Sequence, residues 1–217
     1  MNINIFGSTG IIGKKTLQLI DTSFPNLKVN LICAKSNLTL LKKQIYKYKP
    51  KYAFLYDEKQ KFTSIKKIDN TRILSFEELL SYLLSSKSNF SLLAISGYKS
   101  LYYLDHIIKN TDNLGIVSKE AIVSAGHIFR KKNFFKKTKI FPLDSEHFSI
   151  FDNLNNRINK TNIKKIILTA SGGPFYKKKF KSLKNIKFSQ AIKHPKWKMG
   201  YKNSIDSATL VNKCLEL

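Results

Sequence analysis

The sequence predicts an α/β protein built on a doubly wound parallel sheet, followed by an incomplete second α/β domain. Short apolar runs alternate with amphipathic stretches over the first ~140 residues, which is typical of a parallel sheet covered by helices on both faces. A glycine-rich turn directly follows the first apolar run. The regular alternation stops after Leu143. We therefore place one domain at 1–143 and the start of a second at 144–217.

Each predicted element follows from the period of its apolar residues. The predicted strands are 3–6, 27–34, 52–56, 91–95, 114–117 and 140–143, with a further strand at 163–170 in the second domain. The predicted helices are 14–22, 38–48, 76–84, 101–109, 121–129 and 147–158. Three segments are predicted to be loops: 7–13, the charged connection 130–139 and the lysine-rich stretch 176–187.

The composition suits a packed protein in a reducing compartment. The 217 residues are 42% hydrophobic and 12% aromatic, so a core can form. No apolar run approaches the roughly 18 residues of a membrane span, and the N-terminus lacks the pattern of an export signal. Cys33 and Cys214 are far apart and show no metal-binding spacing. We expect a cytoplasmic protein with no membrane partner.

The formal charge of +25 raises the question of nucleic acid as a partner. Three of the 39 basic residues are arginines (Arg72, Arg130 and Arg157), so 39 minus 3 leaves 36 lysines. Base and phosphate recognition favours the arginine fork. The lysines also accompany many Ile, Asn, Phe and Tyr residues, all with AT-rich codons. Genome bias explains the charge, and we predict solvated lysine faces with no specific nucleic-acid binding.

The first motif is the glycine turn Gly7-Ser-Thr-Gly10-Ile-Ile-Gly13 between a strand and a helix. Glycines let a pyrophosphate approach the backbone, and the unpaired N–H groups of a helix N-terminus attract anions. The position inside the first strand–helix–strand unit favours a dinucleotide site of the Rossmann type. The alternative is a tight glycine turn that binds nothing.

The end of the second strand distinguishes the two nicotinamide cofactors. NAD sites place an acid there to bind the ribose 2′-hydroxyl. This chain has Ala34-Lys35-Ser36-Asn37 instead, which favours a 2′-phosphate and therefore NADPH. The alternative is that Lys35 is only one of the many surface lysines.

Two acids lie close together at Asp144 and Glu146, directly after a predicted strand in a chain with only 14 acids. Neighbouring carboxylates repel each other unless a cation or a proton intervenes. Their hard oxygens suit Mg²⁺ or Mn²⁺. The alternative is ordinary capping of a helix by Asp144, with an acid in its first turn. From these residues alone, both interpretations stand.

Two further segments are rich in groups that bind polar ligands. The turn Ala170-Ser171-Gly172-Gly173-Pro174-Phe175 offers N–H groups and a hydroxyl for a phosphate or a sugar. The segment from His194 to Glu216 contains the single tryptophan, Trp197, among histidine, serine, asparagine, lysine and acid side chains. The alternative for this second segment is helix-capping chemistry around Asp206.

Together these motifs resemble the 1-deoxy-D-xylulose-5-phosphate reductoisomerase family, in the order GSTGIIG, SKE, PLDSEH, SGGPF, HPKWKMG and SIDSATLVNK. The resemblance implies an NADPH site at Gly7, Thr9, Gly10, Ile11, Ile12, Gly13, Ser36, Asn37, Glu120 and Gly200. It implies a divalent metal, Mg²⁺ or Mn²⁺, on Asp144, Glu146 and Glu216. It implies substrate contacts from Lys119, Ser145, Ser171, His194, Trp197, Ser207, Asn212 and Lys213. Catalytic roles would fall to Lys119, Glu146 and His194.

The resemblance also implies the reaction. The family converts the sugar phosphate 1-deoxy-D-xylulose 5-phosphate to 2-C-methyl-D-erythritol 4-phosphate for isoprenoid synthesis by the non-mevalonate pathway. The chain departs from the family pattern at Ser118, Lys35 and Cys214. Semialdehyde and acyl-phosphate reductases share the glycine opening, but they need a catalytic cysteine in the second domain, and neither Cys33 nor Cys214 suits that role.

The family continues beyond the length of this chain and forms homodimers, a state that is doubtful for a shortened chain. We therefore expect cofactor binding to persist and turnover by these 217 residues to be absent or poor. The alternatives are a decayed remnant that retains only cofactor binding and, with less support, a basic nucleic-acid-binding protein.

Overall fold

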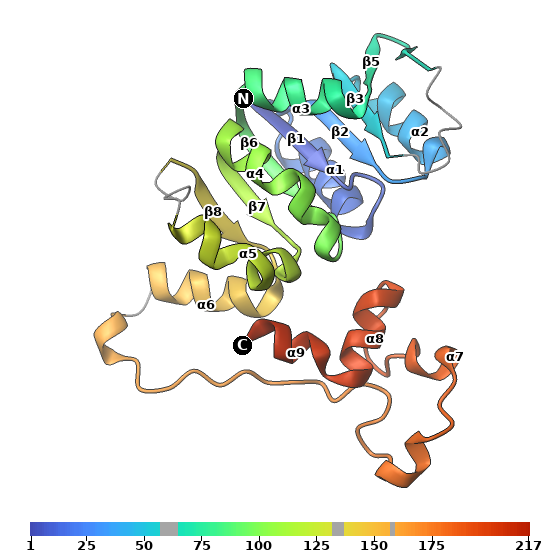
Figure 1. Cartoon of the computed structure of the whole chain (residues 1–217), viewed down its shortest axis with the longest axis vertical. Helices are drawn as coiled ribbons and strands as arrows, with labels where there is room; N and C mark the ends of the chain where they lie inside the picture. Colours follow the sequence, from blue (N-terminus) through green and yellow to red (C-terminus); the bar gives the residue numbers. More distant parts are fainter. Residues whose placement is uncertain (57–64, 132–136, 157–158) are drawn as a thin grey trace. The chain divides into compact units, whose positions relative to one another are not determined.

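The computed structural model describes residues 1–56, 65–131, 137–156 and 159–217 (Figure 1). The chain divides into two compact units, Met1–Asp144 and Ser145–Leu217. No helix within the described ranges is long and apolar enough to cross a lipid bilayer.

The first unit contains one sheet, to which the described residues contribute eight strands in the order β4-β5-β3-β2-β1-β6-β7-β8. The strands are β1 (Asn2–Phe6), β2 (Lys28–Ala34), β3 (Tyr52–Leu55), β4 (Lys67–Ile68), β5 (Thr71–Leu74), β6 (Ser88–Leu93), β7 (Thr111–Ile116) and β8 (Lys139–Pro142). All pairings are parallel except β4 with β5. The predicted α/β fold with a doubly wound parallel sheet is confirmed, and a short antiparallel strand, β4, is added at one edge of that sheet.

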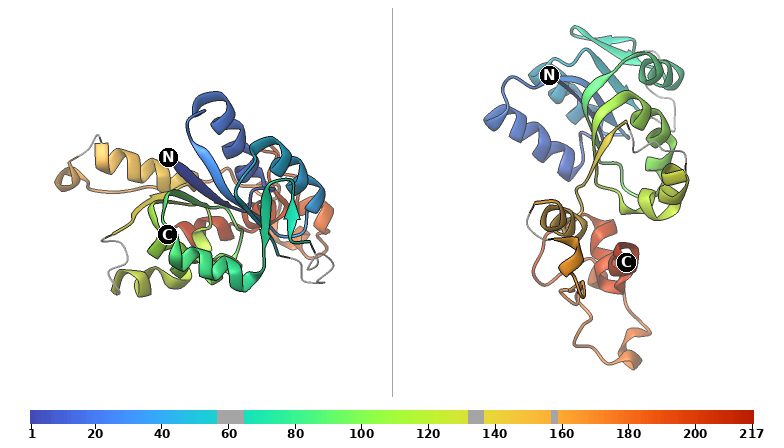
Figure 2. Two further views of the ribbon diagram at one scale, coloured as in Figure 1. Left: turned by 90° about the horizontal axis from the view of Figure 1, so that it is seen from above. Right: turned by 90° about the vertical axis from the view of Figure 1, so that its left-hand side faces the viewer.

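Helices cover both faces of this sheet (Figure 2). They are α1 (Ile11–Ser23), α2 (Leu38–Tyr48), α3 (Phe76–Ser85), α4 (Leu101–Asn110) and α5 (Lys119–Lys131), with a 3₁₀ turn η1 (Tyr98–Ser100) before α4. One apolar cluster joins the sheet to α1 and α2, and a second joins it to α3, α4 and α5. This arrangement is doubly wound.

The β2 strand shows why a continuous apolar run belongs at the centre of such a sheet. Successive side chains of a strand point to opposite faces. Leu31 and Cys33 pack in the cluster beneath α3 and α4, whereas Ile32 and Ala34 pack in the cluster beneath α1 and α2. All four are buried because both faces are covered.

The strand order predicts a ligand-binding crevice at the carboxyl ends of the central strands. The chain runs outward from β1 through β2 to β3 and then returns to β6 on the other side of β1. The connections after β1 and β6 therefore leave in opposite directions. Ligands of open α/β sheets bind at this switch point, outside the carboxyl ends of the strands.

Several predicted boundaries in the first unit were wrong. Gly13 belongs to α1 and not to a loop, because the helix begins at Ile11. The β4–β5 hairpin was missed because its strands are short and carry Lys67 and Arg72. Of the predicted charged connection at 130–139, residues 132–136 lie outside the described ranges.

The second unit is built of helices joined by irregular segments. They are α6 (Ser145–Asn156), α7 (Phe188–Ala191), α8 (Tyr201–Thr209) and α9 (Val211–Glu216), with 3₁₀ turns η3 (Lys160–Asn162) and η4 (Phe180–Leu183). The strand predicted at 163–170 was wrong, since none of the described residues here belongs to a strand. A strand needs a paired neighbour to satisfy its backbone. Ile166 and Ile167 remain 53% and 70% exposed.

Candidate functional site

The glycine turn after β1 is held in a fixed shape. Gly7 adopts a φ of 93°, which favours glycine, and the N–H groups of Gly7 and Ser8 both donate to Cys33 O at 2.9 Å. The buried Ser8 hydroxyl donates to Gln44 Oε1 at 2.8 Å, and Gln44 Nε2 donates back to Ser8 O at 2.8 Å. The turn is therefore tied to both β2 and α2.

Two glycines are required by close packing around this turn. A Cβ on Gly7 would lie 2.5 Å from Ala94 O, and a Cβ on Gly13 would lie 2.3 Å from Gly7 O. Gly13 thus lets the first turn of α1 pack against the loop. Its role is to shape the site rather than to line it.

A cavity of about 360 Å³ opens at the carboxyl edge of the sheet, beside this turn. Its lining residues follow four neighbouring strands: Gly7, Thr9 and Gly10 after β1, Cys33, Ala34 and Lys35 at β2, Phe54 and Tyr56 at β3, and Ala94, Ile95, Ser96, Lys99, Tyr102 and Tyr103 beyond β6. The N-cap of α1 is Gly10, which provides no side-chain cap, so the first N–H groups of the helix can bind an anion. Ile11 and Ile12 in that first turn are 49% and 36% exposed.

The segment after β2 starts the next helix. Asn37 is the N-cap of α2, and its Oδ1 accepts a hydrogen bond from Leu40 N at 2.9 Å. Its amide nitrogen is the part of that side chain suited to donate to a phosphate. Lys35, Ser36 and Asn37 are all exposed. Of these three residues, Lys35 lines the cavity.

The sequence Ser118-Lys119-Glu120 spans the start of α5, and its side chains form two separate polar contacts. The buried Ser118 donates from Oγ to Glu120 Oε2 at 2.8 Å. Lys119 Nζ lies 2.9 Å from Asp144 Oδ2, and the two side chains are only 13% and 14% exposed.

Helices α6 and α9 bring together three charged side chains of the second unit. Lys213 and Glu216 lie one turn apart on α9, with Lys213 Nζ 2.8 Å from Glu216 Oε2. Lys213 Nζ also forms an ion pair with Glu146 Oε1 on α6. The Glu216 side chain is almost fully buried, at 1% exposed. His147 Nε2 lies 3.1 Å from the backbone oxygen of Glu216, which joins the same two helices.

The ionisation of Glu146 follows from these contacts. Partial burial alone would raise its pKa, but hydrogen bonds from Lys213, from the Ser145 hydroxyl and from its own backbone N–H outweigh burial and lower the pKa to about 2. The Ser145 Oγ–Glu146 Oε2 distance is 2.5 Å. Glu146 is therefore an anion at neutral pH.

These residues form a set of donors that suits a divalent cation. Asp144 directly precedes α6, and one carboxylate oxygen from each of Asp144, Glu146 and Glu216 lies within 4.8 Å of the others. Hard oxygen ligands are those that Mg²⁺ and Mn²⁺ prefer. The Lys213 ammonium forms ion pairs with two of the three carboxylates, and its positive charge lies where a bound metal ion would also place positive charge. The residues present thus fit a metal.

Ser171 and His194 meet in the second unit, with Oγ and Nε2 2.9 Å apart. His194 Nδ1 accepts from the backbone N–H groups of Lys196 and Trp197 at 3.2 and 3.0 Å. A neutral ring whose Nδ1 accepts must carry its proton on Nε2. That proton is donated to Ser171, which leaves the serine hydroxyl proton available to a ligand.

The other predicted substrate residues lie along α8 and α9. The turn at Gly173, with a φ of 63°, packs so closely on α8 that a Cβ would lie 2.7 Å from Ser207 O. Ser207 is buried, and Asn212 Oδ1 is buried without a hydrogen-bond partner among the described residues. Gly200 is the N-cap of α8, and Trp197, three residues earlier, is 62% exposed.

Sequence reasoning missed residues that line the cavity from distant parts of the chain. Lys99, Tyr56 and Tyr102 belong to no motif, and only the strand order brings them beside the glycine turn. The Ser8–Gln44 pair was missed for the same reason. A polar residue on the buried face of α2 was the one signal that pointed to Gln44.

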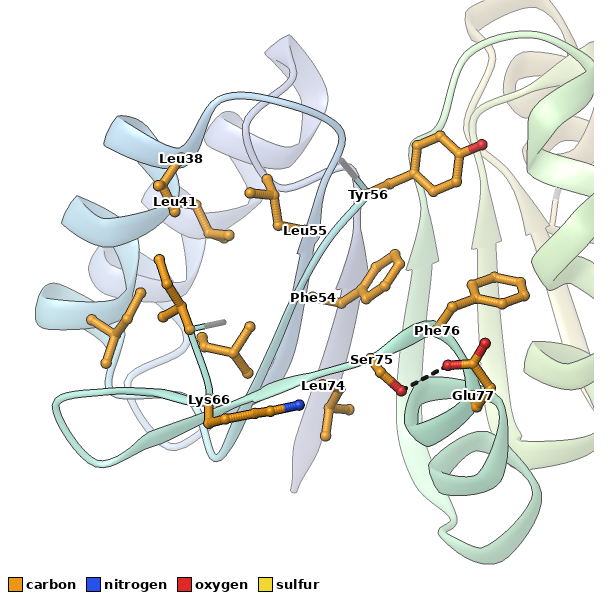
Figure 3. A pocket seen from close by; sticks show the side chains of 13 residues that line it. Leu38, Leu41, Phe54, Leu55, Tyr56, Lys66, Leu74, Ser75, Phe76 and Glu77 are labelled. Atoms are coloured by element: carbon orange, nitrogen blue, oxygen red, sulfur yellow. Dashed lines mark hydrogen bonds between the residues drawn. The ribbon is translucent and has the colours of Figure 1, made fainter. Parts of the chain in front are cut away.

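A second hollow of about 340 Å³ lies between α2 and the β3–β5 strands (Figure 3). Its lining is mostly apolar, with Lys66, Ser75 and Glu77 as its polar members. Ser75 Oγ donates to Glu77 Oε2 at 2.9 Å. It has neither a glycine turn nor a group of acids, so it carries no functional argument.

Comparison with known proteins supports a single family. Residues 3–126 match 1-deoxy-D-xylulose 5-phosphate reductoisomerase, and residues 140–217 match the 1-deoxy-D-xylulose 5-phosphate reductoisomerase C-terminal domain. The chain is 40% identical over 214 residues to the reductoisomerase of Thermodesulfovibrio yellowstonii, which covers 98% of this chain and 56% of the relative. It is 37% identical over 219 residues to that of Pelagibacter ubique, which covers 99% of this chain and 56% of the relative.

Solved structures agree with this result. The Zymomonas mobilis reductoisomerase in complex with NADPH superposes with a TM-score of 0.83 at 27% identity, covering 99% of this chain and 56% of that one. A DOX-P reductoisomerase in complex with NADPH, fosmidomycin and magnesium gives a TM-score of 0.84 at 29% identity, covering 100% and 56%. The chain thus spans a little over half the length of the relatives it matches.

Proposed function

The chain belongs to the 1-deoxy-D-xylulose 5-phosphate reductoisomerase family, and we propose that it serves that family's reaction. The reaction converts 1-deoxy-D-xylulose 5-phosphate to 2-C-methyl-D-erythritol 4-phosphate with NADPH and Mg²⁺ or Mn²⁺. The observation that carries the proposal is that one chain holds both a glycine-lined crevice and a carboxylate cluster suited to a metal.

We assign residues 1–143 to cofactor binding. The N–H groups of Thr9 and of the first residues of the uncapped helix α1 would donate to the dinucleotide phosphates. Gly7 and Gly10 would shape the turn, since their own N–H groups donate to Cys33 O and to Gly7 O. Ile11 and Ile12 would pack against the cofactor. Its 2′-phosphate would meet the segment after β2, where Ser36 and the amide nitrogen of Asn37 can donate. A further contact would come from Glu120.

We assign residues 144–217 to the start of the catalytic and metal-binding domain. Asp144, Glu146 and Glu216 would hold the ion. Ser171 offers a hydroxyl proton, and the buried Asn212 Oδ1 offers an acceptor for a substrate hydroxyl. Further substrate contacts would come from Ser145, His194, Ser207 and Lys213. Trp197, exposed before α8, would close over the substrate.

The chemistry divides between the bound groups and the chain. When bound, the divalent ion supplies Lewis-acid stabilisation of oxyanions, and NADPH supplies the hydride. The chain's carboxylates would hold the ion, and Lys119 adds positive charge beside Asp144. His194, protonated on Nε2, holds Ser171 so that its hydroxyl faces a ligand. Phosphate contacts far from the reacting carbons supply binding energy for orientation.

The metal assignment can be tested on the chain itself. We expect one Mn²⁺ to bind, as measured by electron paramagnetic resonance of the free ion. Asp144→Asn should weaken that binding at least about tenfold, because a carboxylate ligand is lost. The matched control is Asp112→Asn, whose carboxylate pairs with Lys87 away from the cluster. No Mn²⁺ binding, or equal losses in both variants, would contradict the assignment.

Activity is tested separately by NADPH oxidation in the presence of substrate and Mn²⁺. Oxidation that requires both additions supports the full proposal. Binding of NADPH and Mn²⁺ with no oxidation would restrict the proposal to cofactor and metal binding.

A further inference from the structure

The crevice beside the glycine turn contains a pair of lysines. Among its described lining residues, the charged ones are Lys35 and Lys99, and both are cations. The remaining lining is apolar, aromatic or small and polar. Two like charges beside a concave, partly apolar surface make a site for an anion, since low-dielectric walls strengthen their field.

Lys99 reaches this site from an ordered turn. It lies in η1, which Ser100 secures by donating from Oγ to Gly97 O at 2.8 Å. From there the side chain extends until Nζ lies 5.6 Å from the centre of the Tyr56 ring. A cation held over an aromatic face has fewer rotamers to lose when it binds a ligand.

Tyr56 fixes where along the crevice that ammonium lies. Its backbone N–H donates to Ala34 O at 2.8 Å, so the tyrosine is anchored to the last residue of β2. Lys35 follows Ala34 directly. The side chain of Lys99 therefore spans from the β6 side of the switch point to the ends of β2 and β3. In sheets of this order, the end of β2 is where the adenosine ribose 2′-oxygen lies.

We propose that Lys99, together with Lys35, binds the 2′-phosphate of NADPH and thereby selects NADPH over NADH. The inference rests on the proposed use of a nicotinamide dinucleotide by this crevice. A 2′-phosphate carries close to two negative charges, and two lysines match them. NADH lacks this phosphate and gains nothing from the pair. Lys99 is thus a specificity residue outside the glycine motif and outside the segment after β2.

The test compares two lysines that each lie over a tyrosine ring at one end of β3. Lys51 Nζ lies 5.4 Å from the ring centre of Tyr52, at the opposite end of β3 from Tyr56. Lys51→Met therefore removes the same charge and the same kind of ring contact away from the crevice. Dissociation constants for NADPH and NADH are measured by fluorescence titration of the full chain, Lys99→Met, Lys35→Met and Lys51→Met. Circular dichroism confirms that each variant is folded.

We expect Lys99→Met to weaken NADPH binding about tenfold, since a charge-assisted contact is lost, and to change NADH binding by less than about twofold. Lys51→Met should change neither. Competition with 2′,5′-ADP, which carries the 2′-phosphate, should weaken in Lys99→Met, whereas competition with 5′-AMP should not.

Three results would overturn the inference, and they differ in what they say of the proposed function. If the unaltered chain binds neither dinucleotide, both fail together. If it binds NADPH but Lys99→Met leaves the affinity unchanged, only the role of Lys99 fails. If Lys99→Met weakens NADPH and NADH equally, Lys99 contacts a group common to both cofactors, and its role in selection is wrong.

Discussion

The two units of this chain are stabilised in different ways. Unit Met1–Asp144 buries apolar side chains in clusters on both faces of its sheet. In unit Ser145–Leu217, Ala191 is the one buried hydrophobic residue among those the structure describes, whereas Ser204, Ser207 and Glu216 are buried polar residues. The first unit is thus shaped by burial of apolar surface, and the second by short polar contacts and ion pairs.

The two kinds of packing suit two kinds of ligand site. A dinucleotide crevice needs a rigid edge, and the first unit provides one through ladder-like bonds such as Ala94 N to Phe6 O at 2.8 Å. The charged groups that suit a metal or a phosphate lie on short helices with little apolar support. Their geometry should therefore respond to bound ions more than the geometry of the crevice does.

The largest expected effect comes from the core of the first unit. Leu104 is fully buried between α4 and the sheet, so Leu104→Ala should lower the free energy of unfolding by about 2–5 kcal/mol through lost burial and a cavity. Ile167 in the second unit is 70% exposed, and Ile167→Ala should change it by less than about 0.5 kcal/mol. Urea unfolding monitored by circular dichroism measures both. Similar losses would show that the two units do not differ as described.

The second-largest effect is expected from replacing a glycine in α1, with a glycine in α5 as the control. Gly13→Ala in α1 places a methyl group 2.3 Å from Gly7 O, which should cost about 1–3 kcal/mol or more and weaken NADPH binding. The control is Gly126→Ala in α5, where the nearest atom is a side-chain carbon of Ile122 at 3.5 Å. That change should be neutral or stabilise by up to about 1 kcal/mol. Thermal unfolding and NADPH titration of both variants check this, and a harmless Gly13→Ala would mean that the turn can move.

The third effect concerns the charged cluster of the second unit. Lys213 competes with any metal for the oxygens of Glu146 and Glu216, so Lys213→Met should tighten Mn²⁺ binding about tenfold, or about 1.4 kcal/mol. Lys202→Met is the control, because Lys202 pairs with Asp206 on α8 at 2.5 Å. Calorimetric titration with Mn²⁺ measures both. Unchanged or weaker binding in Lys213→Met would show that the ammonium does not occupy the position of the ion.

The sequence predicted the central elements of the first unit well, because their apolar runs are long and bounded by turns. β2 and α2 were placed within about one residue. The hairpin β4–β5 escaped because its pairing, Lys67 with Arg72 and Ile68 with Thr71, has no alternation that a periodicity argument detects. The strand expected at 163–170 was wrong for a different reason. An apolar run indicates that a segment could be buried in a sheet, but it does not show that a neighbouring strand is present to pair with it.

The residues of the candidate site also differ in how far the sequence could predict them. Residues close together in sequence, such as the glycine turn or Asp144 with Glu146, were singled out from their spacing, which for the two acids left helix capping open as the alternative to a metal site. The family resemblance suggested Glu216, but no local pattern indicates that Lys213 would bridge it to Glu146. The contact of Lys99 with Tyr56 depends on the strand order and had no signal in the sequence.

The smallest effect concerns the start of α3, which is capped by side chains. Ser75 Oγ accepts from Glu78 N at 3.2 Å, and Glu78 Oε2 accepts from Ser75 N at 2.8 Å, whereas α8 in the second unit begins at Gly200 with no side-chain cap. Ser75→Ala should cost about 1 kcal/mol, the usual value of a lost cap. Chemical unfolding at neutral pH measures the loss.

The same cap gives a pH dependence whose sign can be stated. The backbone N–H of Ser75, and after it the Arg72 guanidinium, hold the pKa of Glu78 below its ordinary value of 4.5. A carboxyl whose pKa is lower in the folded state stabilises the fold above its unfolded pKa, and this contribution disappears as the pH falls through the folded pKa. Stability should therefore fall on acidification below about pH 4.5, and Glu78→Gln should make that fall shallower. Parallel urea titrations between neutral and acidic pH compare the two proteins. Identical acid profiles would mean that the cap holds Glu78 equally well in its protonated form.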